Sequence, residues 1–147
     1  MLFFELLQIA LGNRERLSVT PSEAEWTELF SFAQEQTLVG IAFTGIELLP
    51  VEQRPPKMLL MQWYSLANLI KVRNAEQDRK SLAVANRFLG DGFKSVILKG
   101  QGMAQLYAKG EYRVPGDIDI WIEGDRKTIM NWVSDYSPKN APVYHNV

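Results

Sequence analysis

Two aspartates late in the chain, Asp117 and Asp119, have the residue type and spacing of a site for a divalent cation. They belong to the alternating segment D-I-D-I, which predicts a β-strand over residues 117–122. Residues i and i+2 of a strand point to the same face, so we expect the two carboxylates side by side, with their α-carbons roughly 7 Å apart. Carboxylates that close repel each other. A divalent cation between them, or protonation of one of them, relieves the repulsion.

Magnesium fits such a pair because it binds through one or two carboxylates and leaves its other positions to water and phosphate oxygens. The same pattern also fits an edge strand with one charged, solvated face. Trp121 shares the face of the two aspartates, so that face is not simply a wet one. The residues alone leave both interpretations open.

A glycine-containing turn precedes the aspartates. The run S-V-I-L predicts a strand over residues 95–98, and the turn K-G-Q-G then leads into a short helix expected over residues 103–108. Glycines let the backbone approach a ligand closely, and the free N–H groups at a helix start favour an anion such as phosphate. An ordinary tight turn has the same composition, so both interpretations stand. The turn is neither a P-loop, since its lysine precedes the glycines, nor a dinucleotide-binding fingerprint.

Together, L-K-G-Q-G over residues 98–102 and D-I-D-I over residues 117–120 resemble the signature of the DNA polymerase beta-like nucleotidyltransferase superfamily. That signature is a hydrophobic residue, a glycine turn, a spacer, and then Asp-hydrophobic-Asp. The intervening run is similar to one branch, a family of uncharacterised bacterial nucleotidyltransferases. Its motif reads L-K-G, a helix with a tyrosine, an Arg-Pro-like turn and G-D-I-D. The resemblance covers about residues 93–136, and the helical first half is similar to the family only in texture.

The resemblance implies transfer of a nucleoside monophosphate from a nucleoside triphosphate to a hydroxyl acceptor that the sequence does not identify. Asp117 and Asp119 would be the catalytic carboxylates and would hold Mg²⁺. The backbone amides of the glycine turn would cradle the β- and γ-phosphates, and two cations would add positive charge. The nucleotide-binding residues implied in this way are Lys99, Gly100, Gln101, Gly102 and Arg113.

Two departures from the family pattern matter. Gln101 follows Gly100 where superfamily members have serine or glycine, and no later strand supplies the third carboxylate that the pattern contains. We therefore expect the chain to be a fragment that lacks the C-terminal strands of the catalytic core. The alternative is a catalytically inactive module that binds a nucleotide or serves as a scaffold. A different alternative is a helical interaction protein that docks through the helix expected over residues 57–89.

The elements that must position the motif are mostly helical. Thr20 is expected to cap the second helix, with Pro21 at its first position and Glu23 completing a capping box. At 1.5 Å per residue the longest helix would reach about 50 Å, so we expect a break or projection near residues 72–76. The expected helices cover residues 2–11, 21–40, 41–49, 57–89 and 125–136, and a loop over 137–142 and a strand from residue 143 follow.

These elements predict a mixed α+β fold. A helical region over residues 1–90 is followed by the start of a nucleotidyltransferase core over residues 91–147, with a small mixed sheet and flanking helices. The long helix is expected to expose its polar middle, residues 71–80, to solvent.

Composition narrows the chemistry further. The 147 residues include no cysteine, which excludes disulfides and thiolate ligands, and the single histidine, His145, excludes a multi-histidine zinc site. Sixteen basic and seventeen acidic residues give a net charge of −1, so nucleic acid is not an expected partner. No signal peptide and no run of about 20 apolar residues is present, so we expect a cytoplasmic protein without membrane contact.

Overall fold

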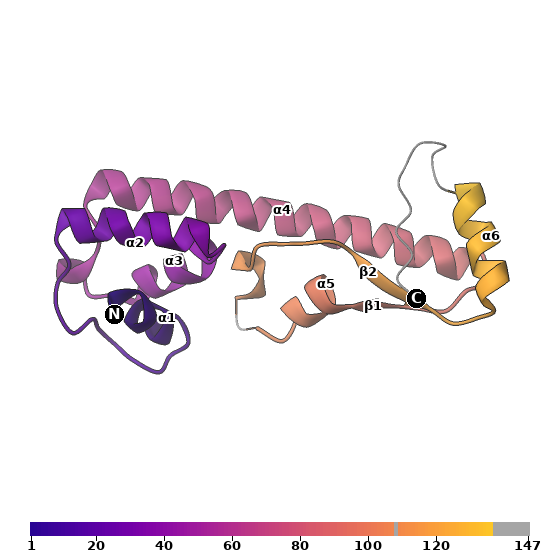
Figure 1. The fold of residues 1–147 in the computed structure, drawn as a ribbon, viewed down its shortest axis with the longest axis horizontal. Coiled ribbons are helices and arrows are strands. Elements are labelled where there is room, and N and C mark those ends of the chain that lie inside the picture. The colour runs from indigo at the N-terminus through magenta and orange to yellow at the C-terminus, as the bar shows by residue number, and fades with distance from the viewer. Residues whose placement is uncertain (108, 137–147) are drawn as a thin grey trace.

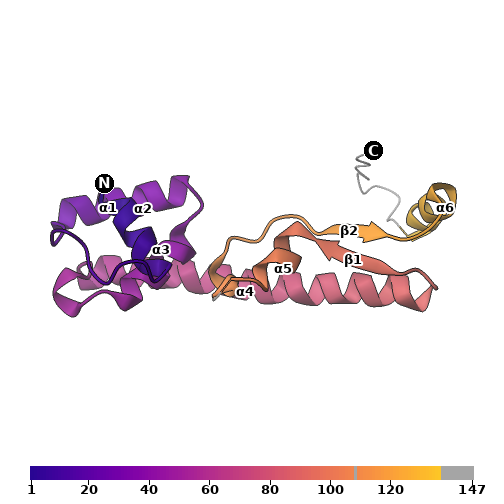
Figure 2. The same cartoon turned by 90° about the horizontal axis from the view of Figure 1, so that it is seen from below.

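The computed structural model describes residues 1–107 and 109–136, and in this part the protein is elongated (Figure 1). Three helices, α1 (Leu2–Ala10), α2 (Glu23–Glu35) and α3 (Val39–Leu48), gather around the first half of the long helix α4 (Lys57–Gly90). The second half of α4 projects from this bundle and carries the smaller elements alongside it (Figure 2). These are β1 (Ser95–Leu98), α5 (Lys99–Ala104), β2 (Asp119–Ile122) and α6 (Arg126–Tyr136), with the 3₁₀ turns η1 (Val51–Gln53) and η2 (Gly110–Tyr112). The expected α+β class is confirmed.

The main hydrophobic core lies in the helical bundle. Buried residues at three- and four-residue steps give α1, α2 and the first half of α4 one apolar face each, whereas α3 is buried on most of its sides. These surfaces meet at a centre that includes Trp26 and Trp63. Phe30 packs on Trp63 with ring centroids 4.9 Å apart. Tyr112 and Val114, which come from the second half of the chain, also pack against this core.

The second helix begins and ends differently from the prediction. Its cap is Ser22 rather than Thr20, because Ser22 and Glu25 form a complete capping box. Glu25 Oε2 accepts a hydrogen bond from the Ser22 amide at 2.7 Å, which lowers the pKa of Glu25 below its ordinary value. The helix ends at Glu35, and Thr37 follows with a φ of 57°. Gly40, expected as the stop, instead lies inside α3.

Gly40 has a packing role. A Cβ atom there would overlap the backbone carbonyl of Tyr112, so only glycine lets the η2 segment lie directly on α3. This contact brings a segment from the second half of the chain against the helical bundle.

Helix α4 is continuous over 34 residues and projects from the bundle, so of the two alternatives expected near residues 72–76, a break or a projection, the structure shows the projection. Its predicted stop is also confirmed, with Asp91 at the C-cap and Gly92 at a φ of 86°. The polar middle of α4, residues 71–80, was expected to be exposed to solvent, but it is partly buried. Asn74 is 2% exposed, and its amide nitrogen donates hydrogen bonds to the carbonyls of Glu111 at 2.8 Å and Arg113 at 2.6 Å.

Strands β1 and β2 pair antiparallel, with Val96 opposite Trp121 and Leu98 opposite Asp119. A small mixed sheet was expected, and within the described residues the sheet consists of this one antiparallel pair. Helix α6 packs against the end of α4 through Trp132, whose ring centroid lies 4.3 Å from that of Phe88. The loop expected over residues 137–142 and the strand expected from residue 143 lie outside the described residues. In the part of the chain that the structure describes, no helix combines the length and apolarity needed to cross a membrane.

The link between Asn74 and the loop after α5 predicts a stability effect. Replacing Asn74 with alanine should lower the free energy of unfolding by about 1–3 kcal/mol, because the carbonyls of Glu111 and Arg113 lose their buried donor. Urea denaturation measures the change. Asn68→Ala is the matched control, since Asn68 is an exposed asparagine on the same helix and its replacement should change stability by less than about 0.5 kcal/mol. Equal effects of the two substitutions would contradict the assigned role of Asn74.

Candidate nucleotidyl-transfer site

The two halves of the motif lie together at one end of the β1–β2 hairpin. Leu98, the last residue of β1, is the register partner of Asp119, the first residue of β2. The ammonium of Lys99 lies 3.7 Å from a carboxylate oxygen of Asp119. A Cβ built on Gly100 would lie 3.3 Å from the carbonyl oxygen of Asp117, so the turn backbone passes directly by the aspartate segment. Antiparallel pairing thus joins residues that are far apart along the chain.

The turn itself departs from the expected geometry. Helix α5 is assigned from Lys99 to Ala104, so the helix predicted over residues 103–108 begins earlier and ends earlier, and residue 108 lies outside the described part. The helix is kinked at Gly100, which has a φ of 24° and a ψ of −107°. Lys99 also has a positive φ, 45°. Lys99 and Gly100 thus have positive φ values in succession, which turns the chain sharply after β1. At the second position, a glycine adopts this conformation without the steric cost of a Cβ atom.

The strand that holds the aspartates is shorter than predicted. Strand β2 begins at Asp119, so the expected strand start at residue 117 is wrong and Asp117 lies in the segment before the strand. Asp117 is exposed and the Asp119 side chain is 44% exposed. Because both side chains reach solvent, water screens the repulsion that a fully desolvated pair of carboxylates would suffer.

Two hydrated carboxylates near one turn fit a magnesium ion that keeps most of its waters or exchanges them for phosphate oxygens. They do not make a closed protein cage. Among the described residues, no group of three or more histidine, cysteine, aspartate or glutamate side chains is placed to hold a metal ion. Any metal at this position would therefore need oxygen ligands from a substrate or from water.

The predicted nucleotide-binding cations have different surroundings. Lys99 is 77% exposed and pairs with Asp119 across the hairpin end. Arg113 is half-buried, and its Nη1 is enclosed without a hydrogen-bond partner among the described residues. The Arg113 carbonyl is held by Asn74. The structure therefore brings Lys99 to the motif, whereas no hydrogen bond or ion pair in the described part joins Arg113 to either aspartate.

Gln101 is buried against helix α4, whereas Gly102 is exposed but lies close to the end of strand β1. The Gln101 side chain is 6% exposed, and its nitrogen donates a 2.6 Å hydrogen bond to Asp78. Because its side chain binds Asp78, Gln101 can contribute only backbone groups to a ligand at the glycine turn. A Cβ on Gly102 would lie 2.6 Å from the carbonyl oxygen of Ile97, so this glycine allows α5 to pack closely on β1.

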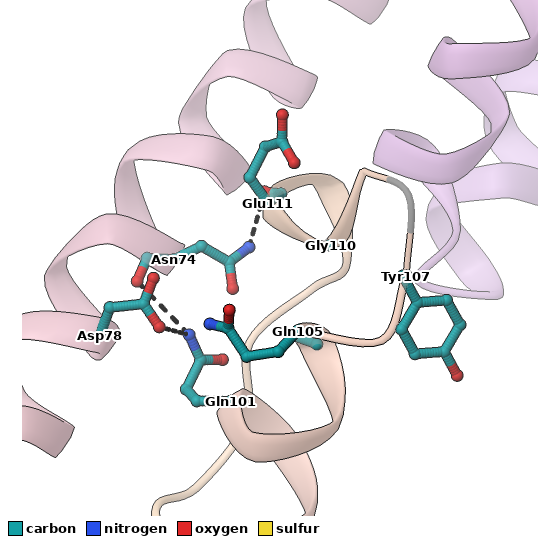
Figure 3. A pocket seen from close by; sticks show the side chains of 8 residues that line it. Asn74, Asp78, Gln101, Gln105, Tyr107, Gly110 and Glu111 are labelled. Atoms are coloured by element: carbon teal, nitrogen blue, oxygen red, sulfur yellow. Dashed lines mark hydrogen bonds between the residues drawn. The ribbon is translucent and has the colours of Figure 1, made fainter.

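Sequence reasoning missed the partners of Gln101. Asn74 and Asp78 lie one helical turn apart on α4, and together with Gln101 they line a cavity of about 230 Å³ (Figure 3). The remaining lining residues are Ala104, Gln105, Tyr107, Gly110 and Glu111. The i, i+4 spacing of two short polar residues in a helix was the available signal, but it is common on solvated helix faces.

Residues 22–132 match the model of a protein family described as uncharacterised nucleotidyltransferases. The match spans more than half of the chain and begins at the cap of α2, so the family pattern includes the helical part as well as the motif. No curated protein and no solved structure gives a significant match.

Close packing of α5 on β1 predicts that Gly102 is needed for the fold of the turn. Gly102→Ala should lower the free energy of unfolding by about 1–3 kcal/mol, because the added methyl group meets the Ile97 carbonyl, which cannot move away easily. Gly116→Ala is the matched control, since a Cβ there meets no atom within 4 Å. Urea denaturation should separate the two variants, and a neutral Gly102→Ala would contradict the packing role.

Proposed function

Because the chain belongs to the family of uncharacterised nucleotidyltransferases, we propose that it transfers a nucleoside monophosphate from a nucleoside triphosphate to a hydroxyl acceptor. One observation supports this part of the molecule as the site of the proposed activity. The Gly100 turn and the segment that holds Asp117 and Asp119 lie against each other at one end of the hairpin. Nucleotidyl transfer depends mainly on positioning and charge neutralisation, so the phosphates must lie next to the metal that the carboxylates bind. A turn and an aspartate segment in contact meet this requirement.

In this proposal Asp117 and Asp119 hold Mg²⁺ on their exposed carboxylates. A Mg²⁺ ion held there would neutralise phosphate charge and polarise the attacking hydroxyl. The two carboxylates would hold the ion at the end of β2 that faces the glycine turn. Their placement before and at the start of β2 gives Asp117 the freedom of a loop residue and fixes Asp119 by the strand register.

Lys99 balances the charge of the site. Its ion pair with Asp119 is exposed on both sides, so it contributes about 1 kcal/mol or less and gives way readily to a dication. Once released, the Lys99 ammonium lies at the glycine turn, where it can neutralise phosphate oxygens. The amides of the Gly100–Gly102 turn and the guanidinium of Arg113 complete the proposed nucleotide-binding set.

The test measures nucleotide binding and transfer in the same protein. Thermal unfolding of the full chain with each of the four common nucleoside triphosphates should show stabilisation that requires Mg²⁺. Asp117→Asn and Asp119→Asn should abolish this stabilisation and any Mg²⁺-dependent release of pyrophosphate, while the melting temperature without ligand stays nearly unchanged. Asp135→Asn, an exposed position on α6, is the matched control and should behave like the unaltered chain. Stabilisation that survives both substitutions would refute the metal assignment.

A second candidate function is nucleotide binding without transfer. The observation that favours it is the absence of a three-carboxylate group among the described residues, because a third carboxylate is part of the family's pattern. Stabilisation by a triphosphate and Mg²⁺ without pyrophosphate release would support this candidate. Pyrophosphate release that depends on Asp119 would exclude it.

A further inference from the structure

One face of the β1–β2 hairpin exposes large apolar side chains. Strand β1 packs against α4, which runs along the hairpin (Figure 2). The residues of the more buried face are Ser95, Ile97, Ile120 and Ile122. On the other face the exposed fractions are 54% for Val96, 42% for Leu98 and 52% for Trp121. Single exposed apolar residues are common on protein surfaces, whereas a contiguous group beside a candidate site indicates a binding surface. We refer to these three side chains as the Trp121 platform.

The strand register brings the platform together and places it beside the proposed metal site. Val96 lies directly opposite Trp121, and Leu98 is a diagonal neighbour within reach of an aromatic side chain. Residues two apart on a strand point to the same face, so Asp119 lies on this face as well, roughly 7 Å from Trp121 along the strand. The platform therefore begins where the aspartate segment ends.

A charged pair limits the platform at its other end. Lys94 and Glu123 follow on the same face, where the ammonium of Lys94 lies 3.6 Å from a carboxylate oxygen of Glu123. From Asp119 to Glu123 a strand advances roughly 13 Å, which is comparable to the length of one nucleoside. A stable protein interface has about 20–30 residues on each side. Three apolar side chains between two charged ends thus suit a small flat ligand.

We propose that the base of the nucleoside triphosphate stacks on the Trp121 platform. This inference rests on the proposed function, which places the triphosphate between the glycine turn and the two aspartates. A nucleotide whose phosphates lie at Asp119 can extend its base along the strand to Trp121, because both side chains project from the same face. A nucleobase is flat and aromatic, and the exposed indole offers it a flat apolar surface.

Stacking on an indole recognises the ring of a base and not its hydrogen-bonding edge, because every base has a π-face. The side chains of Val96 and Leu98 add apolar contact and carry no hydrogen-bonding group. The platform therefore supplies affinity for a nucleobase in general. It is a binding surface for the base, separate from the groups that hold the phosphates.

Probes with and without a base test the proposal. Each of the four common nucleoside triphosphates carries a base, whereas inorganic tripolyphosphate offers a chain of three phosphates without one. In calorimetric titrations with Mg²⁺, Trp121→Ala should weaken nucleoside triphosphate binding by about fivefold to 150-fold and leave tripolyphosphate binding unchanged. Trp121→Phe keeps an aromatic face and should retain most of the affinity. Tyr64→Ala is the matched control, since Tyr64 is 58% exposed on the bundle half of α4, and it should leave both affinities unchanged.

The pattern of losses separates failure of the platform from failure of the proposed function. If the unaltered chain binds neither the nucleoside triphosphates nor tripolyphosphate in the presence of Mg²⁺, the proposed function is overturned and the platform with it. If the chain binds them and Trp121→Ala leaves nucleoside triphosphate affinity unchanged, the platform alone is overturned. Equal losses for tripolyphosphate and the nucleoside triphosphates would mean a structural role of Trp121 and would also overturn the platform.

Tryptophan fluorescence of the unaltered chain reports stacking directly. Of the four tryptophans, Trp26 and Trp63 are buried, Trp132 is partly buried, and Trp121 is exposed. A base stacked on an indole quenches its emission, so nucleoside triphosphates with Mg²⁺ should quench part of the fluorescence after correction for absorption by the base, and tripolyphosphate should not. Trp121→Phe should bind without quenching. Quenching that persists in Trp121→Phe, or binding to the unaltered chain without quenching, would overturn the stacking.

Discussion

The buried carboxamide of Asn74 is the interaction on which the second half of the molecule depends. It lies in the middle of α4, one turn beyond Ile70, the last residue of this helix in the bundle core, and its nitrogen donates to the carbonyls on either side of Tyr112. The η2 segment is thereby held against both α4 and α3, where Gly40 provides the space. From this fixed point the chain runs on to Asp117 and β2. A helix that would otherwise project alone thus becomes the support for the hairpin and its motif.

Much of the fold follows from local sequence signals. The strand at residues 95–98, the long helix and its stop at Gly90 to Gly92 were predictable, because periodicity and glycine placement act within a few residues. The cap of α2 was misplaced by two residues, since Thr20 with Glu23 and Ser22 with Glu25 both have the spacing of a capping box, and the one at Ser22 forms. The burial of Asn74 in the polar middle of α4 was missed because the loop that covers this residue lies 37 and 39 residues further along the chain.

The candidate site shows the same division. The order of a glycine turn and an aspartate pair was sufficient to suggest the family, and the pairing of β1 with β2 brings the two together. The sequence did not show that Asp117 lies outside the strand or that Gln101 turns its side chain toward Asp78. Both depend on contacts with distant segments. Alternation alone extends the predicted strand back to Asp117. In the structure β2 begins at Asp119, because its partner β1 ends at Leu98, opposite Asp119.

The central claim is that a metal-bound nucleotide lies between the Gly100 turn and the aspartate segment, and its most direct test is paramagnetic relaxation. Mn²⁺ added in trace amounts with a nucleoside triphosphate should broaden the backbone amide signals of residues 100–102 and 117–120 before all others, because relaxation falls steeply with distance from the metal. The triphosphate should sharpen this localisation, and excess Mg²⁺ should reverse it. Broadening that is centred on α4 or spread evenly over acidic side chains would contradict it.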